Sequence, residues 1–367
     1  MNVLFLDSWL RDRATGSGSA VAIAGLARGL ADLGHEVKVL RPNVDLGSLD
    51  LTRWFYNVTL RRRIDRLAER FDVVVGFDVD GWALPRDLPT RLGFSYVVSL
   101  KGVAAEEAKF ETGLSRLRFE AIRRLEGRNA RKARRVFVTS DYAAQAAIEA
   151  YDLDPSRVRI APEALDDTVR ERAAAAHVAF RAGAERFHAP GPTVLSVARQ
   201  YPRKDTPTLL RAFARVVARL PEARLRIVGD GPELSANRRL ATELKVQDRV
   251  VFTGALASTD ALDAEYRAAR VFCLPSRQEG FGIVFLEAMA YGLPIAAAAA
   301  GAVPEVAPDG ETSILVPAGD EAALADALER LLTDPDMAAR LGETGAARVA
   351  RFDWTSSARA FLEGFDD

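Results

Sequence analysis

Residues 276–294, SRQEGFGIVFLEAMAYGLP, place two glutamates, Glu279 and Glu287, eight residues apart around a Gly-Phe-Gly turn. An extended apolar run, 269–274, precedes this stretch, and helix-forming residues follow the turn as far as Gly292. The pattern predicts a strand, a tight loop and a helix. The start of that helix would point unpaired backbone N–H groups and a positive dipole end at the loop, where a diphosphate or a polarised sugar oxygen could bind.

The two glutamates are predicted to reach a ligand at different depths. Glu279 lies at the mouth of the loop and Glu287 lies inside the helix. Their carboxylates could therefore accept hydrogen bonds from hydroxyls on two rings of one ligand. A solvated helix with two surface glutamates is the alternative, and the spacing alone does not decide between them.

Length and composition restrict the class of protein. A chain of 367 residues with 49% hydrophobic content can bury two cores, and its formal net charge of −1 argues against a nucleic-acid partner. No apolar run approaches the roughly 20 residues that span a bilayer, and the start of the chain reads as a strand, Val3–Leu6, rather than a signal peptide. We therefore expect a cytoplasmic protein that could also contact the inner face of the membrane peripherally.

Cysteine and histidine are scarce. Cys273 is the single cysteine, and no Cys or His cluster has the spacing of metal ligands. The sequence predicts no disulfide and no bound metal.

Short β-branched runs alternate with helix-length amphipathic segments, and the pattern occurs twice. The candidate strands of the first half are 2–6, 36–40, 73–76, 95–100, 135–139 and 158–161. Those of the second half are 192–198, 224–229, 250–253, 271–274, 294–297 and 312–316. The pattern predicts an α/β protein with two Rossmann-like domains that face each other across a deep cleft, at the carboxyl ends of both sheets.

We expect three parts along the chain. Residues 1–165 form the N-terminal domain, 166–191 a charged, Ala-rich linker that ends in a Pro-Gly pair, and 192–349 the C-terminal domain. A last helix, at about 350–367, is expected to pack back on the N-terminal domain.

Two loops carry further candidates. Residues 197–204, VARQYPRK, follow the first strand of the second half, so Arg199 and Lys204 could grip a diphosphate and neutralise a leaving group. Exposed loop cations are the alternative. Near the N-terminus, Gly16 and Gly18 stand in a Gly-rich loop before a helix; it is neither a dinucleotide fingerprint nor a P-loop, and helix capping by its serines is an equal explanation.

Together these loops resemble the retaining nucleotide-sugar glycosyltransferases of the GT-B fold, and among them glycosyltransferase family 4 (glycosyl transferases group 1). The resemblance covers almost the whole chain and is strongest over 194–332. In that region it rests on 198–204, the turn Val-Gly-Asp-Gly-Pro at 228–232, Phe-Thr-Gly at 252–254, the stretch 275–294, and Gly-Ala-Val-Pro-Glu at 301–305. In the first half it rests on 16–19, 33–39 and 138–140.

The resemblance implies roles for individual residues. Glu287 would bind the ribose hydroxyls, Arg199 and Lys204 the diphosphate, and Glu279 the hydroxyls of the donor sugar. Further donor contacts would come from Gly280, Phe281, Gly282, Ile283, Gly254, Gly18 and Gly16. The implied reaction moves a hexosyl unit from a UDP-, GDP- or ADP-hexose with retention at the anomeric carbon, without a metal or other cofactor.

The chain departs from the family pattern at three places. Lys101 stands where many relatives have a histidine near the reacting sugar, and we expect it to take a catalytic role there. Asp205 replaces the glycine that usually follows the lysine, and Ser17 separates two glycines that are commonly adjacent. The second departure puts the contacts of the basic loop in question, and the third leaves open which glycine meets the donor.

The sequence leaves the acceptor and the rival functions open. Arginines at 61–63 and an arginine cluster at 116–135 fit an anionic membrane surface or a phosphorylated acceptor, but a solvated helix face is the favoured interpretation. The acceptor could be a glycan, a lipid-linked molecule or a small phosphorylated molecule. A GT-B nucleotide-sugar epimerase and a non-catalytic nucleotide-sugar-binding protein are the alternatives, whereas an NAD-dependent oxidoreductase would need a Gly-x-Gly-x-x-Gly turn that is absent.

Overall fold

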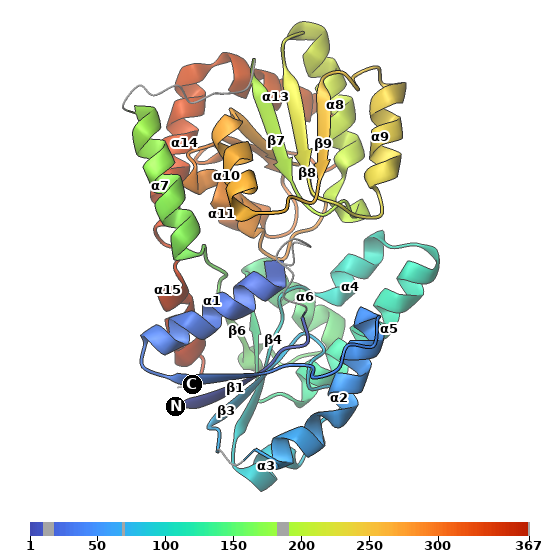
Figure 1. Cartoon of the computed structure of the whole chain (residues 1–367), viewed down its shortest axis with the longest axis vertical. Coiled ribbons are helices and arrows are strands. Elements are labelled where there is room, and N and C mark those ends of the chain that lie inside the picture. The colour runs from blue at the N-terminus through green and yellow to red at the C-terminus, as the bar shows by residue number, and fades with distance from the viewer. Residues whose placement is uncertain (10–17, 68–69, 182–190, 366–367) are drawn as a thin grey trace. The chain divides into compact units, whose positions relative to one another are not determined.

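The computed structural model describes residues 1–9, 18–67, 70–181 and 191–365, and these fold into two compact units (Figure 1). Among the described residues, the first unit takes 1–164 together with the segment from Trp354 onward, and the second unit takes 165–353. Each unit is built around one parallel sheet.

The first sheet has the strand order β2-β1-β3-β4-β5-β6 and the second has the order β12-β11-β10-β7-β8-β9, with every pair parallel. The strands of the first sheet are β1 (Asn2–Leu6), β2 (Glu36–Leu40), β3 (Val73–Phe77), β4 (Ser95–Ser99), β5 (Arg135–Val138) and β6 (Val158–Ile160). Those of the second are β7 (Thr193–Val197), β8 (Arg224–Val228), β9 (Val250–Gly254), β10 (Val271–Leu274), β11 (Ile295–Ala298) and β12 (Ser313–Val316). Every predicted strand is confirmed, with bounds that agree to within one residue.

Helices connect the strands in each unit. Those of the first unit are α1 (Gly18–Asp32), α2 (Leu49–Asp65), α3 (Leu88–Leu92), α4 (Ala104–Glu107), α5 (Gly113–Lys132), α6 (Asp141–Tyr151) and α15 (Trp354–Glu363). Those of the second are α7 (Asp167–Arg181), α8 (Thr206–Arg219), α9 (Leu234–Glu243), α10 (Thr259–Ala268), α11 (Ile283–Ala290), α12 (Val303–Val306), α13 (Glu321–Thr333) and α14 (Pro335–Val349). Among the described residues, no helix combines the length and the apolar character that crossing a membrane requires.

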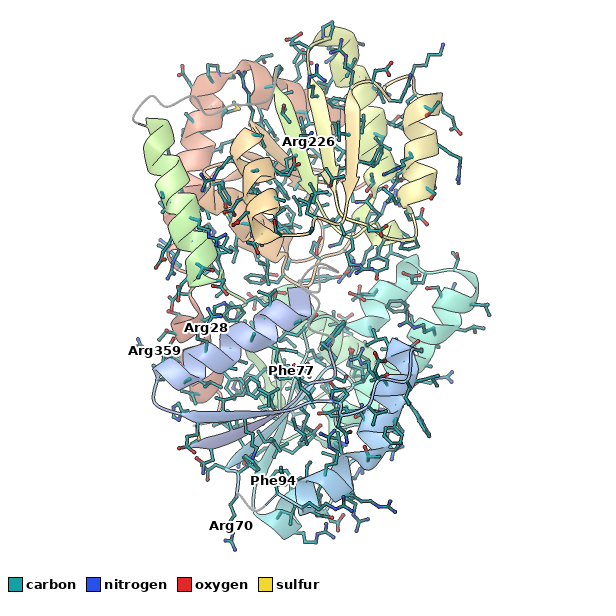
Figure 2. The ribbon with its side chains drawn as sticks, in the orientation of Figure 1. Arg28, Arg70, Phe77, Phe94, Arg226 and Arg359 are labelled. Carbon is teal, nitrogen blue, oxygen red and sulfur yellow. The ribbon has the colours of Figure 1, made fainter. Side chains whose placement is uncertain are left out.

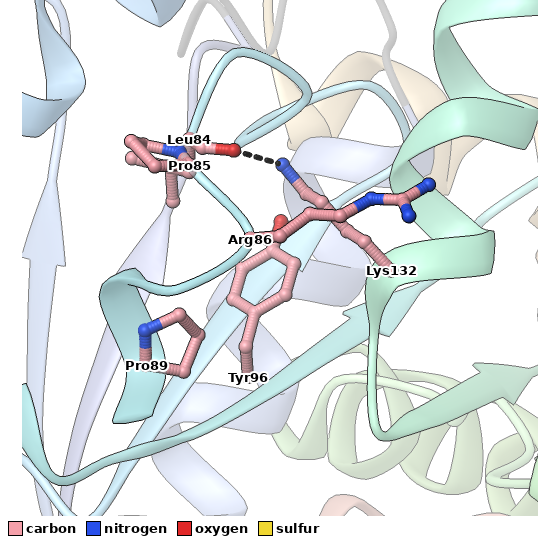
Figure 3. Close-up of a pocket in the computed structure, with 6 residues that line it drawn as sticks. All are labelled: Leu84, Pro85, Arg86, Pro89, Tyr96 and Lys132. Carbon is pink, nitrogen blue, oxygen red and sulfur yellow. Dashed lines mark hydrogen bonds between the residues drawn. The ribbon is translucent and has the colours of Figure 1, made fainter. Parts of the chain in front are cut away.

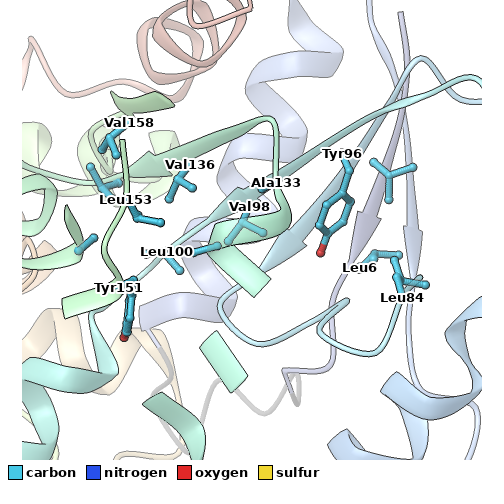
Figure 4. Close-up of a cluster of buried hydrophobic side chains, with 14 of the residues drawn as sticks. Leu6, Leu84, Tyr96, Val98, Leu100, Ala133, Val136, Tyr151, Leu153 and Val158 are labelled. Carbon is cyan, nitrogen blue, oxygen red and sulfur yellow. The ribbon is translucent and has the colours of Figure 1, made fainter. Parts of the chain in front are cut away.

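The central strands are buried on both faces, as expected of parallel sheets covered by crossover helices. All five residues of β3 are buried, and Figure 2 labels Phe77 at its end. The Phe77 ring packs edge-on against Phe5 with ring centroids 4.9 Å apart. On one face, Val98 and Val136 meet Tyr151 and other helix residues in a continuous apolar cluster (Figure 4). The apolar runs that predicted the strands therefore also form the core.

The segment predicted as a linker differs from the expectation. Its residues from Asp167 to Arg181 form helix α7, which packs against α11 inside the second unit. Val169 and Ala173 stand four residues apart, so both face the core cluster of that unit, where Ala173 is fully buried. Alanine, whose abundance suggested a linker, also strongly favours helix formation. Burial of one apolar row then stabilises the segment as a helix.

Two glycines of α1 allow close packing against α15 in the first unit. A Cβ atom added to Gly25 would lie 2.0 Å from the indole Cε2 of Trp354, and one added to Gly29 would lie 2.1 Å from the Trp354 carbonyl oxygen. The contact therefore requires residues without a side chain at both positions.

We expect Gly25→Ala to lower the free energy of unfolding by about 1–3 kcal/mol, because the overpacked indole must move. The matched control is Gly18→Ala in the same helix, where an added Cβ meets no atom within 4 Å. Chemical denaturation of both variants measures the difference. Equal stability of the two variants would contradict the packing argument.

Candidate functional site

The carboxyl edge of the second sheet brings the two predicted loops together. Strands β7 and β10 are neighbours, so the basic loop after Val197 and the loop after Leu274 leave the sheet side by side. The Lys204 Nζ lies 2.5 Å from the Glu279 Oε1, and their side chains are only 13% and 8% exposed. The Ser276 hydroxyl donates to the same carboxylate oxygen at 2.8 Å.

The charges around Glu279 determine its ionisation. Burial alone would raise the pKa of this carboxyl group, but the charges of Lys204 and Arg203 and the hydrogen bonds from Lys204 and Ser276 outweigh it, so the pKa lies below its ordinary value. Glu279 is therefore a buried carboxylate that stays ionised at neutral pH. A surface glutamate, the alternative left open by the spacing, is excluded at this position.

Asp205 reinforces the same pair of loops. Its φ of +51° lies in the left-handed region, where glycine is favoured and aspartate is tolerated better than most residues. Its Oδ2 accepts hydrogen bonds from the Arg277 Nε at 2.7 Å and from the Thr208 hydroxyl at 2.9 Å. The Arg277 N–H also donates to the Arg203 carbonyl at 2.8 Å. Aspartate can therefore replace the family glycine, because its carboxylate ties the Lys204 loop to the Glu279 loop.

The basic loop carries two arginines besides Lys204. The guanidinium carbons of Arg199 and Arg203 lie 5.4 and 5.6 Å from the ring centroid of Tyr201. Stacking of this kind helps to hold an arginine head group in place. Arg199, Arg203 and Lys204 thus form a concentrated positive region at the edge of the sheet.

The Gly-Phe-Gly turn is determined by backbone geometry. Gly282 caps the start of α11 with a φ of +94°, and an added Cβ would lie 2.6 Å from the Phe285 Cδ2. The Phe281 side chain is buried in the core, edge-on to Phe352 at 5.9 Å, and Ile283 packs partly against the same core. Any ligand contact of Phe281 must therefore come from its backbone, and the turn leaves the amides of 280–282 at the helix start.

A third loop holds the backbone of Glu279. Gly301 has a φ of +58°, and an added Cβ would lie 2.5 Å from the Glu279 carbonyl oxygen. The N–H of Ala302 donates to that carbonyl at 3.0 Å. The glycine after β11 is therefore required so that this loop can approach Glu279.

Glu287 lies within helix α11 and has its own set of partners. Its Oε2 accepts a hydrogen bond from the Tyr266 hydroxyl at 2.7 Å, and the Tyr266 ring stacks on Tyr291 with centroids 5.0 Å apart. Burial of the carboxyl group, reinforced by the charge of Asp263, raises the pKa of Glu287 to about 7 against the opposing hydrogen bond from Tyr266. Sequence reasoning missed Tyr266, because an aromatic residue on an amphipathic helix is typical of a core position.

The remaining predicted residues of the second unit lie at glycine turns. Gly254 ends β9 with a φ of +69°, and its carbonyl accepts the N–H of Gly229 at 2.8 Å. An added Cβ at Gly229 would lie 2.0 Å from the Ala198 carbonyl oxygen, so the turn at 228–232 supports the basic loop through close backbone packing. In the first unit, Gly18 is the first residue of α1, whereas Gly16 lies outside the described residues.

Lys101 lies at the carboxyl edge of the first sheet. Its backbone N–H donates to the Asp78 Oδ1 at 2.7 Å, its Nζ lies 5.8 Å from the Phe77 ring centroid, and burial lowers its pKa. Asp78 also accepts the Trp9 indole N–H at 3.1 Å, and burial raises the Asp78 pKa to about 6. Lys101 is thus held among buried acidic groups within the first unit.

Two more polar residues at this edge were missed. Asp80 is fully buried and accepts hydrogen bonds from the Ser8 N–H at 2.8 Å, from the Ser8 hydroxyl and from Asn57 at 3.0 Å. Ser8 closely follows β1, and Asp80 closely follows β3. Polar residues directly after buried strands were the signal that could have identified them.

A small pocket of the first unit is lined by Tyr96, whose hydroxyl donates to the Asp80 carbonyl at 3.2 Å (Figure 3). Its Lys132 ammonium group donates to the carbonyls of Gly81 and Leu84, the latter at 3.2 Å, and stands over the Tyr96 ring. Burial and nearby arginines lower the Lys132 pKa to about 7. This lysine links the loop after β3 to α5.

Among the described residues, no group of three or more His, Cys, Asp or Glu side chains is arranged to hold a metal ion.

We expect Asp205→Ala to lower the free energy of unfolding by about 1–3 kcal/mol, because alanine keeps the left-handed strain and loses both hydrogen bonds. Asp205→Gly is the matched control, since it loses the same bonds but relieves the strain. Urea denaturation of the two variants separates the two contributions. If alanine were tolerated as well as aspartate, the carboxylate would have no bracing role.

Comparisons with known proteins agree with this architecture. The family model described as glycosyl transferases group 1 matches residues 183–348, and the glycosyl transferase 4-like domain matches residues 17–164. A GDP-mannose-dependent alpha-(1-6)-phosphatidylinositol monomannoside mannosyltransferase of Mycobacterium tuberculosis (strain CDC 1551 / Oshkosh) is 40% identical over 186 residues, which are 48% of each chain. A D-inositol 3-phosphate glycosyltransferase of Nocardia farcinica is 33% identical over 299 residues, 78% of this chain and 62% of that protein. The chain spans about half the length of the first of these relatives.

Solved structures show the same fold. Sucrose-phosphate synthase from Thermosynechococcus elongatus superposes with a TM-score of 0.79 at 23% identity, covering 100% of this chain and 98% of that chain. Anabaena Alr3699/HepE, crystallised with UDP and glucose, superposes with a TM-score of 0.74 at 19% identity, covering 100% and 99%. With two Rossmann-like units, two matching family models and these neighbours, the chain belongs to glycosyltransferase family 4, the glycosyl transferases group 1, of the GT-B fold.

Proposed function

We propose that this protein transfers a hexosyl unit from a nucleoside diphosphate sugar to a hydroxyl acceptor, with retention at the anomeric carbon. The observation that carries the proposal is the buried ion pair of Lys204 and Glu279 beside Arg199 and Arg203. A cationic loop next to an ionised carboxylate offers one partner for phosphate oxygens and another for sugar hydroxyls.

In this proposal the basic loop stabilises the leaving group. Breaking the bond between the anomeric carbon and the phosphate leaves negative charge on the diphosphate, which Arg199 and Lys204 would neutralise. Fixed protein cations would supply the charge that a metal ion supplies in other transferases, so the reaction would proceed without one. Glu279, whose carboxylate is ionised, would accept hydrogen bonds from the hexose, and Glu287 would accept them from the ribose. Gly280, Gly282, Gly254 and the N-terminal glycines would contribute backbone contacts to the donor.

The names of the relatives suggest which substrates to test first. One relative is named for GDP-mannose and phosphatidylinositol monomannoside, and another for D-inositol 3-phosphate. GDP-mannose is therefore our first donor, with UDP- and ADP-hexoses as competitors, and a hydroxyl on an inositol-type or glycan acceptor is the proposed target. Lys101, held among the buried acids of the first unit, is proposed to contact the reacting sugar or the acceptor.

We expect purified protein to release the nucleoside diphosphate slowly from one donor in a panel of GDP-, UDP- and ADP-hexoses. Lys204→Ala should lower kcat/KM at least about 100-fold, as removal of one stabilising group at a developing charge commonly does. The control is Lys109→Ala, an exposed lysine ion-paired with Glu106 in the first unit.

Product analysis separates the rival functions. Anomeric NMR of the product should show the configuration of the donor. Release of a free sugar epimerised at carbon 2 would favour an epimerase, and binding without turnover with every donor and acceptor would favour a non-catalytic protein. Absence of both binding and release with all donors would contradict the proposal.

The raised pKa of Glu287 predicts a pH dependence of nucleotide binding. Below its pKa of about 7 the carboxyl group is protonated and loses acceptor capacity for the ribose hydroxyls. Affinity for GDP or UDP should therefore fall as pH falls through 7, by up to about tenfold for each further pH unit. Isothermal titration calorimetry at about pH 6 to 8 measures this change in affinity.

Two controls isolate Glu287 from the titration of the phosphates themselves. Glu287→Gln should bind weakly with a flatter pH profile, because an amide does not titrate. Pyrophosphate, which lacks a ribose, should follow only the phosphate titration. An identical profile for GDP and pyrophosphate would argue against ribose binding by Glu287.

A further inference from the structure

Large apolar side chains are exposed on two neighbouring helices of the first unit. Among the described residues, ten large hydrophobic side chains are exposed, and five of them belong to α2 and the beginning of α5. The five are Leu51 (56% exposed), Trp54 (56%), Val58 (41%), Leu114 (84%) and Leu117 (67%). Single exposed apolar residues are ordinary, but a concentration on one part of the surface indicates an interaction site.

Helix geometry places these residues in two rows. Leu51, Trp54 and Val58 recur at intervals of three and four, so they share one face of α2, while Tyr56 and Leu60 of the same helix lie in the core. Leu114 and Leu117 form a second row on the first turn of α5.

An ion pair joins the two rows. The Arg118 Nε and Nη2 donate to the two carboxylate oxygens of Asp50 at 2.6 and 2.8 Å. Asp50 adjoins Leu51, and Arg118 adjoins Leu117, so the bidentate pair joins the two rows into one surface, on the right of the first unit in Figure 1. We call this surface, made of Leu51, Trp54, Val58, Leu114 and Leu117, the α2–α5 face.

Exposed arginines lie beside the α2–α5 face. Helix α5 contains seven basic and two acidic residues, but its basic residues Arg131 and Lys132 lie at the far end of the helix, bound to backbone carbonyls of the first unit. The acidic side chains are largely neutralised within the unit: Glu120 pairs with Arg123 and Arg124, and Asp50 with Arg118. Arg61 and Arg62 are exposed on the turn of α2 after Val58, Arg61 at 3.9 Å from the Asp65 carboxylate, and Arg116 lies between the two exposed leucines of α5.

We propose that the first unit docks on an anionic lipid bilayer through the α2–α5 face. Leucine and tryptophan side chains would enter the boundary between head groups and acyl chains, while the flanking arginines would contact lipid phosphates with their long stems along the apolar surface. A second copy of the chain fits less well, because a symmetric contact through this face would place arginines opposite arginines. The face belongs to the first unit and the proposed diphosphate grip to the second, so the docking does not depend on the proposed reaction.

The experiment is flotation of the full chain with vesicles of phosphatidylcholine mixed with phosphatidylglycerol, compared with phosphatidylcholine alone. The wild type should float with the anionic vesicles and separate from them at high salt. The double variant Leu114→Ser, Leu117→Ser should partition at least about tenfold less, because the two most exposed apolar anchors of the face are lost. The matched control is Leu92→Ser, which changes an exposed leucine of α3 (39% exposed) outside the face and should float as the wild type does.

A spectroscopic readout locates the contact. Trp54 is more than half exposed, so its emission should shift to the blue when anionic vesicles are added, and Trp54→Phe should remove that shift. Arg61→Gln, Arg62→Gln should weaken binding to anionic vesicles and reduce its salt dependence. Far-UV circular dichroism of each variant checks that the fold is retained.

Three outcomes would overturn the docking proposal. The first is a wild type that does not float with anionic vesicles, and the second is a serine double variant that floats as well as the wild type. The third is a concentration-dependent dimer in sedimentation equilibrium that the serine variant abolishes, since the face would then bind a second copy. Donor hydrolysis measured without vesicles is a separate assay, so failure of one proposal is distinguishable from failure of the other.

Discussion

The buried ion pair between Lys204 and Glu279 is the interaction on which the candidate site depends. Two charges with little solvent exposure are stable only when each has the other close by and further hydrogen bonds satisfy the remaining atoms. Glu279 has Ser276 as a second partner, and the adjacent Asp205 and Arg277 form a parallel bridge between the same two loops. Because strands β7 and β10 are neighbours, the sheet sets the distance that both bridges span.

Glycines around this pair allow close backbone packing and tight turns. Gly301 lets the loop after β11 approach Glu279, Gly229 lets the loop after β8 approach the basic loop, and Gly282 turns the chain into α11. None of these positions has space for a side chain that the present backbone could accept. The site is therefore rigid around Glu279, which suits a group that must be in place before a substrate arrives.

The first unit combines buried acidic residues at its sheet edge with exposed apolar and basic residues on its outer helices. Its sheet edge buries Asp78 and Asp80, which are satisfied by Ser8, Trp9, Asn57 and the Lys101 backbone, and its outer helices expose leucine, tryptophan and arginine. The proposed diphosphate grip and the proposed membrane contact thus belong to separate units.

Local apolar patterns and short motifs were sufficient to predict the strands, the two Rossmann-like halves, the glycine turns and the chemical type of the candidate residues. Tertiary structure alone decided that Lys204 pairs with Glu279, 75 residues away, and that Tyr266 meets Glu287. It also decided that the Phe281 side chain enters the core and that residues 167–181 form α7 rather than a linker. Each of these features requires burial against a distant segment, and a local pattern does not contain the identity of its distant partner.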